Sequence, residues 1–341
     1  MSMLSPSTLT ILTTYRCTAA CRQCCFESSP DVSGRLTLEQ MIGRIDEARA
    51  NFDTLQLVVF SGGEATLLKS DLHDAIRHCS DLGLMTRIVS NGSWGKGERS
   101  AAAMATALAD AGLTELNIST GKDHQEFVPV ASVIQGACAA TDAGIPTLIT
   151  IEADDADSTR FREIASDPRV KSRVNSRMLN LQSNSWMPFK GDAEVRVQQV
   201  DKESLRGGCR QIFDNAVITP HHNLSACCGL TLEHIPEMRL GQCDGKNLGA
   251  LYKEQATDFL KFWLRVDGPY SIIEAAMGED AEEVLEGVVH ICQACSILHK
   301  NEVVKERVRS LAPQVAPAVM SRFHLERAMD ARLNQTAKKG I

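Results

Sequence analysis

Cys17-Thr-Ala-Ala-Cys21-Arg-Gln-Cys24 directly follows a β-rich run, Leu9–Tyr15, and its three thiols are separated by three and two residues. One short loop of this kind can surround a four-iron cluster, each thiolate binding a different iron. Fe–S clusters are usually held by four cysteines, so three ligands leave one iron open to a substrate or cofactor. Structural zinc sites favour paired two-residue spacings and complete four-ligand sets. The loop therefore predicts a [4Fe-4S] cluster with one open iron, and Cys25 is interpreted as a spare buried thiol.

A second distinctive stretch, Ser61-Gly62-Gly63-Glu64, ends the next β-rich run, Thr54–Phe60. Gly62 and Gly63 have no Cβ and so allow backbone carbonyls to approach a ligand closely. Glu64 can accept a charge-assisted hydrogen bond from an ammonium group. Gly-Gly-Glu alone is typical of an ordinary turn, but after the cysteine loop it indicates a ligand site beside the cluster.

The first part of the chain alternates between β-rich runs and helical patterns, which is typical of βα units and a parallel sheet. We therefore predict an α/β fold, a partial (β/α)6 TIM-like barrel over residues 1–195, whose site lies in the loops that follow the strands. The expected strands are Leu9–Tyr15, Thr54–Phe60, Leu84–Ser90, Glu115–Ser119, Pro146–Glu152 and Arg177–Ser185, and the expected helices are Leu38–Ala50, Asp71–Ser80, Glu98–Ala111, Ala131–Ala143 and Thr159–Ser166.

The alternation stops after Gly191, where polar turns and further cysteines begin. We expect residues 196–300 to form a small cysteine-bearing domain and residues 301–341 to form C-terminal helices and a tail. Within the last segment, Glu302–Arg309 and Met320–Leu333 show the pattern of amphipathic helices.

The second cysteine group has enough thiols for a closed Fe–S cluster, and a zinc site is the alternative. Cys228 could replace Cys227 as a ligand, and Cys243 could replace either of them. The preferred ligands are Cys209, Cys227, Cys292 and Cys295.

The cysteine loop after the first strand and Gly-Gly-Glu after the second resemble the radical S-adenosylmethionine (radical SAM) superfamily across the barrel. The resemblance implies S-adenosylmethionine as a cofactor whose amino and carboxylate groups chelate the open iron, with the glycine-rich strand end contacting the amino group. It also implies that Asn91 and Ser119 contact the ribose and carboxylate, and that Phe26 and Ile151 flank the adenine. A turn for Asn91, a strand cap for Ser119 and apolar packing for Phe26 and Ile151 remain alternatives.

Within this superfamily, the second cysteine group resembles the short auxiliary domain called twitch, which holds one extra [4Fe-4S] cluster. The longer SPASM form has seven cysteines and two clusters, more than this group supplies. The resemblance therefore implies two clusters in the chain: one that binds S-adenosylmethionine and one auxiliary cluster.

The adjacent pair Cys227-Cys228 suggests a reaction in which a thiol donates a hydrogen atom to a substrate radical. If one thiolate binds iron, its neighbour does not easily reach the same iron, and a free thiol beside the substrate can return a hydrogen atom to a carbon radical. Runs such as Cys24-Cys25-Phe26 and Ser90-Asn91-Gly92-Ser93-Trp94-Gly95 are similar to those of radical peptide epimerases. Cys228 is accordingly the candidate hydrogen donor, and a buried packing thiol is the alternative. Gly121 and His221-His222-Asn223 depart from that pattern.

Composition limits the partners. The chain has 341 residues, a formal net charge of −7 and no apolar run long enough to span a membrane, so we expect neither nucleic-acid nor membrane binding. Its twelve cysteines, without a secretory signal, favour reduced thiols and a cytoplasmic location. We expect a peptide or small-molecule substrate and an external electron donor such as flavodoxin or ferredoxin.

The preferred reaction is Cα epimerisation of a ribosomally made peptide. A small-molecule dehydrogenase, a peptide cross-linking enzyme and a structural metal protein are the alternatives. The few residues before the first strand leave no room for a leader-binding domain, so we expect the barrel mouth or another protein to recognise a peptide. Of the remaining residues, His124 is a weak candidate for proton transfer, His221 and His222 are interpreted as turn residues, Cys79 and Cys138 as core, and Trp186 and Phe189 as packing residues near the cavity.

Overall fold

The computed structural model describes residues 4–153, 159–189, 200–243, 245 and 247–339. Six neighbouring parallel strands form a partial TIM-type barrel, and the strand order β6-β5-β4-β3-β2-β1 follows the chain in reverse. Each strand lies within a few residues of its predicted position. The strands are β1 (Thr8–Thr14), β2 (Leu57–Gly62), β3 (Met85–Ser90), β4 (Glu115–Thr120), β5 (Thr147–Glu152) and β6 (Leu179–Asn184).

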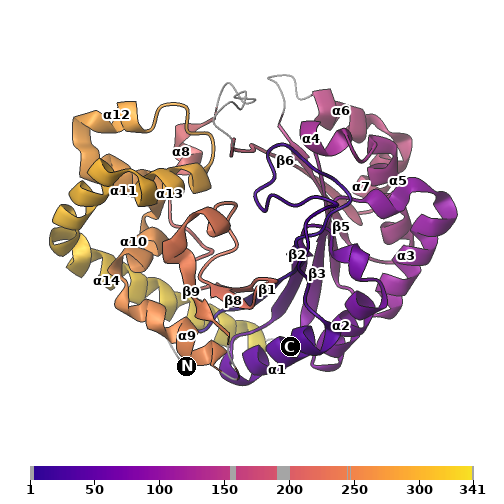
Figure 1. The fold of residues 1–341 in the computed structure, drawn as a ribbon, viewed down its shortest axis with the longest axis horizontal. Helices are drawn as coiled ribbons and strands as arrows, with labels where there is room; N and C mark the ends of the chain where they lie inside the picture. Colours follow the sequence, from indigo (N-terminus) through magenta and orange to yellow (C-terminus); the bar gives the residue numbers. More distant parts are fainter. Residues whose placement is uncertain (1–3, 154–158, 190–199, 244, 246, 340–341) are drawn as a thin grey trace.

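Helices connect these strands and cover the outer face of the sheet (Figure 1). The first long helix begins with a capping box, in which Thr37 and Gln40 each bond the other's backbone N–H. The helices of this half are α1 (Leu38–Asn51), α2 (Ser70–Asp81), α3 (Glu98–Asp110), α4 (Lys122–Gln125), α5 (Val130–Asp142), α6 (Thr159–Ser166) and α7 (Pro168–Asn175).

The sheet continues beyond the six predicted strands. β7 (Asn215–Ile218) pairs in parallel with β1, and β8 (Asn223–Ser225) and β9 (Arg239–Gln242) follow as antiparallel strands. The second half of the chain is therefore joined to the barrel by backbone hydrogen bonds along β1. The proposed boundary between residues 195 and 196 lies outside the described residues.

The remaining helices form the other arm of an open crescent in Figure 1. They are α8 (Lys202–Leu205), α9 (Leu248–Glu254), α10 (Phe259–Val266), α11 (Gly268–Met277), α12 (Ala281–Val284), α13 (Ile291–Lys300) and α14 (Glu302–Lys339).

The last helix differs from the prediction. α14 runs without interruption through Pro313 and Pro317, whereas the sequence pattern predicted two shorter helices. Prolines inside a helix remove a hydrogen bond and usually kink or end it. Here Val308 and Val319, on either side of the prolines, are both buried against the second core, so packing extends the helix across the unfavourable residues.

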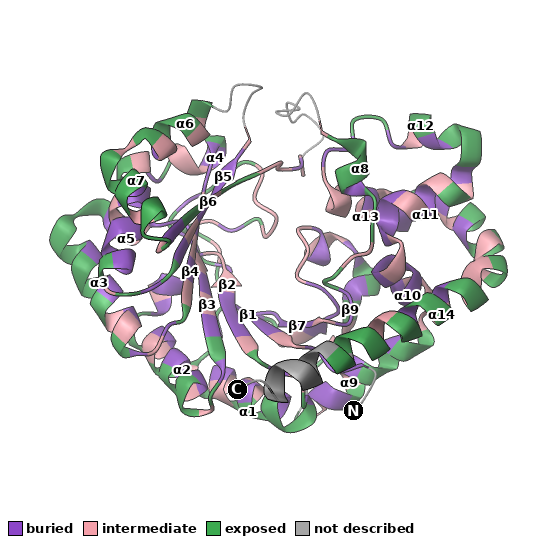
Figure 2. Ribbon diagram, turned by 180° about the vertical axis from the view of Figure 1, so that it is seen from behind, coloured by how far each residue is buried: buried purple, intermediate pink, exposed green. Residues whose placement is uncertain are grey.

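Two apolar cores lie on the two arms. One fills the space between the barrel strands and α1–α3 and α5–α7, and the other packs β7 and the loop after β8 against α10, α11, α13 and α14. In Figure 2 buried residues run along the strands while the outer faces of the helices are exposed. None of the helices in the described part of the chain has the length and apolarity needed to cross a bilayer.

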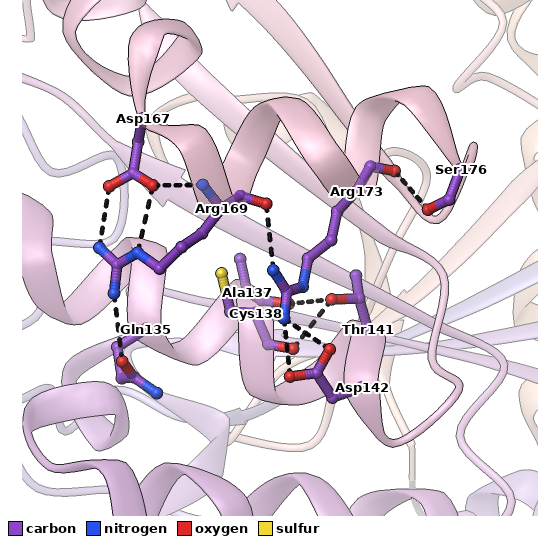
Figure 3. Close-up of polar contacts among 9 residues, drawn as sticks. All are labelled: Gln135, Ala137, Cys138, Thr141, Asp142, Asp167, Arg169, Arg173 and Ser176. Carbon is purple, nitrogen blue, oxygen red and sulfur yellow. Dashed lines mark hydrogen bonds and ion pairs between the residues drawn. The ribbon is translucent and has the colours of Figure 1, made fainter.

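Surface polar contacts fasten α7 to α5 (Figure 3). Arg173 Nη2 lies 2.6 Å from Asp142 Oδ1, and Arg169 Nη1 donates to Gln135 Oε1 over 3.4 Å. Asp167 caps α7 by accepting from the backbone N–H of Arg169. Because these groups are largely exposed, each pair contributes at most about 1 kcal/mol, and the buried face of α5 contributes more.

Candidate functional site

The carboxyl ends of the barrel strands and the cysteine loop surround a cavity of about 640 Å³. This is the face where barrel folds place their ligand sites. The cavity also extends to the second arm of the crescent, because Gln211, Cys228 and His290 contribute to its wall. The predicted site residues that line it are Cys17, Cys21, Cys24, Phe26, Gly62, Gly63, Asn91, Ser119 and Cys228.

The cysteine loop presents its thiols to this cavity with hydrogen-bond donors behind them. Cys17 Sγ accepts from Ala19 N at 3.4 Å and from Asn91 Nδ2 at 3.5 Å, and Cys24 Sγ accepts from Ser28 N at 3.4 Å. Burial raises the pKa of Cys17 to about 11 and that of Cys21 to about 12. Thiols held in this way must lose their protons when a metal binds, and donors to sulfur stabilise the thiolate that results.

Gly62, at the end of β2, and Gly63, the next residue, are required by a close approach of backbone segments. A Cβ on Gly62 would lie 2.4 Å from Thr14 O, and one on Gly63 would lie 2.3 Å from Arg16 O. Gly62 also has φ of +120°, in the region that favours glycine. Any larger residue would push β2 away from the cysteine loop, so the glycines hold the loop and the cavity wall together.

Glu64 is fully buried and does not belong to the cavity wall. Its carboxylate accepts from Thr66 Oγ1 at 2.6 Å, from Ser90 Oγ at 2.8 Å and from Asn91 N at 2.8 Å, as well as from Thr66 N. These donors link the end of β2 to the end of β3. The bond expected from Glu64 to a cofactor ammonium would have to compete with all of them.

The structure after β4 explains why residue 121 is glycine, where the sequence departs from the peptide-epimerase pattern. A Cβ at this position would lie 2.4 Å from Glu152 Oε2, which also accepts from the Lys122 backbone N–H at 2.7 Å. The Glu152 carboxylate of the neighbouring strand β5 therefore lies against this position. Glycine is needed here because the Glu152 carboxylate occupies the side-chain space.

The second cysteine group gathers in the other core. A Cβ on Gly229 would lie 3.1 Å from Cys292 Sγ and 3.7 Å from Cys227 Sγ, and the charges of Cys209, Cys227 and Cys292 all act on Cys295. Cys243, in contrast, is buried in the barrel core with Leu248 and Tyr252. The structure thus separates Cys243 from the four preferred ligands.

Cys228 faces the cavity, held between two amides. Asn215 Nδ2 donates to its sulfur at 3.1 Å, and the thiol donates to Gln211 Oε1 at 3.0 Å. Thr10, on β1, completes this network by donating to Asn215 Oδ1. A residue in the sheet and a residue before β7 thereby fix the position of the thiol.

Three comparisons with known proteins bear on this geometry. Residues 11–151 match the family model of the radical SAM superfamily. These residues are a radical SAM domain.

Relatives of the chain include peptide-modifying enzymes. The "Putative peptide biosynthesis protein YydG" of Bacillus subtilis (strain 168) is 29% identical over 37% of this chain and 39% of its own length. A "PqqA peptide cyclase" of Methylocella silvestris is 23% identical over 65% of this chain and 60% of its own length. The chain therefore spans less than two thirds of the length of each of these relatives.

The fold is shared with solved structures outside the range of clear sequence similarity. The structure of native anSMEcpe with bound AdoMet and Cp18Cys peptide matches with a TM-score of 0.52 and 12% identity, over 91% of this chain and 99% of the other. This likeness extends through both arms of the crescent.

The radical SAM domain implies a [4Fe-4S] cluster and S-adenosylmethionine, and the residues present fit both. Cys17, Cys21 and Cys24 line one cavity with sulfur-directed donors, and Gly62 and Gly63 leave a side-chain-free wall beside them. The cavity is within the size range of small-molecule sites.

One predicted cofactor contact and two turn histidines lie outside the cavity wall. Ile151 is fully buried in the barrel core rather than in the cavity wall, because the strand pleat turns it away from the face that carries Thr150. His221 stacks on Tyr15 with ring centroids 5.2 Å apart, and His222 lies 3.4 Å from Gln40 Nε2. Both histidines are turn residues, as the sequence pattern indicated.

Aromatic residues line more of the cavity than the sequence suggested. Trp186 and Phe189 belong to its wall, although ordinary packing was the preferred interpretation. Trp186 packs edge-on against His124 with centroids 4.8 Å apart, and burial lowers the pKa of His124 to about 4. His124 is consequently a neutral wall residue at neutral pH, with its Nδ1 lacking a partner among the described residues.

Sequence reasoning missed several wall residues of the radical SAM domain and its neighbour. His290 caps α13, accepting from Cys292 N at 3.0 Å, and so positions the helix that carries two cysteines. Arg87 faces the cavity from strand β3, between the buried residues Thr86 and Ile88. An inward-facing arginine in a strand pattern was the available signal, whereas the positions of Gln211 and Asn215 depended on the β1–β7 pairing.

Proposed function

We propose that the chain is a radical SAM enzyme that modifies a ribosomally made peptide by inverting an amino-acid α-carbon, with Cys228 as hydrogen donor. The radical SAM domain and the names of the relatives, a peptide biosynthesis protein and a peptide cyclase, support the general class. The observation that carries the specific reaction is the position of Cys228 in the wall of the same cavity as the three-cysteine loop.

Cys17, Cys21 and Cys24 would hold the [4Fe-4S] cluster. Together with S-adenosylmethionine it would supply a 5′-deoxyadenosyl radical that removes a substrate hydrogen. Gly62 and Gly63 would contact the methionine part of the cofactor through their backbone, Asn91 and Ser119 would contact its polar groups, and Phe26 would pack against the adenine. The assignment of these contacts follows the wall residues of the cavity.

An auxiliary [4Fe-4S] cluster is proposed for the second group. In the described part of the chain, no set of three or more His, Cys, Asp or Glu side chains is close enough to hold a single metal ion. Cys209, Cys227, Cys292 and Cys295 supply the four thiolates that a closed cluster requires, and a zinc site is the alternative.

Cys228 then acts as follows. After an α-hydrogen has left the substrate for the deoxyadenosyl carbon, the Cys228 S–H bond breaks and its hydrogen atom joins the α-carbon from the opposite face. Cys228 is left one hydrogen atom short, and one electron and one proton restore its thiol. A second electron starts cofactor cleavage, so each inversion uses two electrons from an external donor of the flavodoxin or ferredoxin type.

Cross-linking is a second candidate, because two peptide cyclases are among the relatives. It would form a bond within the peptide with loss of two hydrogens and would not require a hydrogen donor. A thiol held in the cavity by Gln211 and Asn215 favours return of hydrogen over bond formation. A dehydrogenase would likewise release a product lighter than its substrate.

The test uses reconstituted enzyme, S-adenosylmethionine, a reductant and a pool of synthetic peptides in deuterium oxide. Inversion through Cys228 predicts D-residues that each carry one solvent deuterium, detected by chiral chromatography and mass spectrometry of hydrolysates. Cys228→Ala should still release 5′-deoxyadenosine but give no D-residue. Cys138→Ala, which removes a buried thiol of α5, is the matched control and should behave as wild type. Products lighter than their substrates would instead indicate cross-linking or dehydrogenation.

A further inference from the structure

Two arginines face the proposed reaction cavity from different elements. Arg87 comes from β3, and Arg210 lies in the segment before β7. Among the described wall residues, Asp214 is the one carboxylate, and it is already ion-paired with Arg265 and Arg327. The wall therefore offers guanidinium groups to a ligand without a free carboxylate to compete for them.

The sheet register fixes the place of Arg87. Thr10 of β1 pairs with Val59 of β2, Val59 pairs with Arg87 of β3, and Arg87 pairs with Glu115 of β4. These four residues form one layer across neighbouring strands about 4.8 Å apart. Thr10 belongs to the hydrogen-bond network of Cys228, so Arg87 lies at the same depth as the proposed hydrogen donor. The charge of Arg87 also acts on the Cys228 thiol.

The guanidinium of Arg87 has hydrogen-bond donors that are not used within the described part of the chain. Its Nη2 donates to Glu115 Oε2 at 2.7 Å, while its Nε is buried without a partner in the described part of the chain. About one third of each side chain of this pair remains exposed. A charged residue in a strand that faces a barrel interior is costly unless its donors are used, so the unused Nε and Nη1 suggest a missing acceptor.

Arg210 has no hydrogen bond or ion pair to any described residue and is exposed to the cavity. Its chain neighbour, Gln211, accepts the hydrogen bond from the Cys228 thiol. Arg87 thus acts on this thiol from the barrel, and Arg210 lines the same cavity from the second arm. Guanidinium groups are suited to carboxylates because their paired N–H groups match the two oxygens.

We infer that the cavity takes a peptide whose acidic side chain, a glutamate or aspartate, is held by Arg87 and Arg210 close to Cys228. This inference rests on the proposed function, because it assumes that a peptide enters the cavity. It names the recognised group: a carboxylate on the modified residue or on a residue next to it. Arg87 would bind this carboxylate from β3, and Arg210 would bind it from the segment before β7.

The test measures peptide capture without turnover. Immobilised holoenzyme with S-adenosylmethionine but no reductant is exposed to acetylated and amidated peptides that are randomised around a central Glu, Asp, Gln or Asn, and the retained peptides are quantified by mass spectrometry. Wild type should enrich Glu or Asp about tenfold over the matching amide, the effect of one charge-assisted hydrogen bond. A further arm uses peptides that lack acidic side chains but have a free C-terminus.

Variants assign the effect to residues. Arg87→Gln and Arg210→Gln should each lower the preference for acidic peptides severalfold, whereas Arg77→Gln, which changes an exposed arginine of α2, should not. Glu115→Gln should strengthen capture of acidic peptides, because it removes the negative charge that competes with the peptide carboxylate for Arg87. If the pair were only structural, Glu115→Gln and Arg87→Gln would both lower thermal stability and leave the preference unchanged.

Three outcomes overturn the inference: no enrichment of acidic peptides by wild type, enrichment that survives both arginine substitutions, or enrichment confined to free C-termini. Release of 5′-deoxyadenosine by the same wild-type preparation is measured separately. Release without any acidic preference would remove this inference and leave the proposed function standing, and absence of release would count against the proposed function itself.

Discussion

Cys227 and Cys228 are consecutive in the chain, yet their thiols lie in different surroundings. Cys227 is buried near Cys292, on the side of Gly229, whereas Cys228 lines the cavity and donates to Gln211 Oε1 at 3.0 Å. Both residues lie in the loop between β8 and β9, where their thiols face different neighbours. Of the two thiols, Cys228 is the one in the cavity wall, but the charge of Cys209 acts on it as well, so both thiols lie near the second cysteine group.

The proposed roles, Cys227 as a cluster ligand and Cys228 as a hydrogen donor, predict different iron contents for two variants. Cys227→Ala should lose about half of the iron of the reconstituted protein, because one of two four-iron clusters would lack a ligand. Cys228→Ala should keep all of it. Iron and sulfide analysis with electron paramagnetic resonance of the reduced protein checks both. Equal iron loss in the two variants would mean that Cys228 is a ligand.

The close approach at Gly63 predicts a stability effect that does not depend on any cofactor. Gly63→Ala should lower the free energy of unfolding by about 2–4 kcal/mol, because the new Cβ would overlap a backbone oxygen of the cysteine loop. Gly43→Ala is the control: Gly43 lies in α1, where an added Cβ would meet nothing within 4 Å, and alanine there should add about 0.5–1 kcal/mol. Urea unfolding of the cluster-free proteins measures both values. An unchanged midpoint for Gly63→Ala would show that the strand end can move.

The burial of His124 leads us to predict that the folded protein loses stability in mild acid. Its pKa is lowered by burial to about 4 in the folded protein, so the unfolded chain binds its proton first as the pH falls. The contribution of neutral His124 is complete above about pH 6.5 and is lost progressively toward pH 4. His124→Phe keeps the ring contact with Trp186 and removes the titration, so it should reduce the difference between urea midpoints at pH 7 and pH 5. A variant with the same difference as wild type would show that other groups cause the acid sensitivity.

Much of the barrel was predictable because its strands and helices carry clear periodic patterns. The six strands and the cavity at their carboxyl ends follow from apolar runs such as Thr54–Phe60 and from the cysteine loop after β1. The continuation of the sheet through β7 to β9 could not be predicted. Asn215–Ile218 is only a short apolar run, and its parallel partner, β1, lies some two hundred residues earlier in the chain.

The finer parts of the site depended on side-chain direction. Ile151 and Thr150 are neighbours that face opposite sides of β5, and the sequence alone did not say which one meets the cavity. Glu64 was expected at a ligand, but the turn after β2 buries it against donors from β3. Arg87 was not singled out, because the sequence alone did not show which side of β3 it faces.

The central claim is that the three-cysteine loop holds a cluster that cleaves S-adenosylmethionine. The most direct measurement is iron and sulfide content after anaerobic reconstitution, together with 5′-deoxyadenosine release on addition of S-adenosylmethionine and a reductant, in wild type and in a variant with Cys17, Cys21 and Cys24 changed to alanine. We predict about eight irons and release for wild type, from two four-iron clusters, and about four irons without release for the variant. Zinc in place of iron, or release that persists in the variant, would contradict the account.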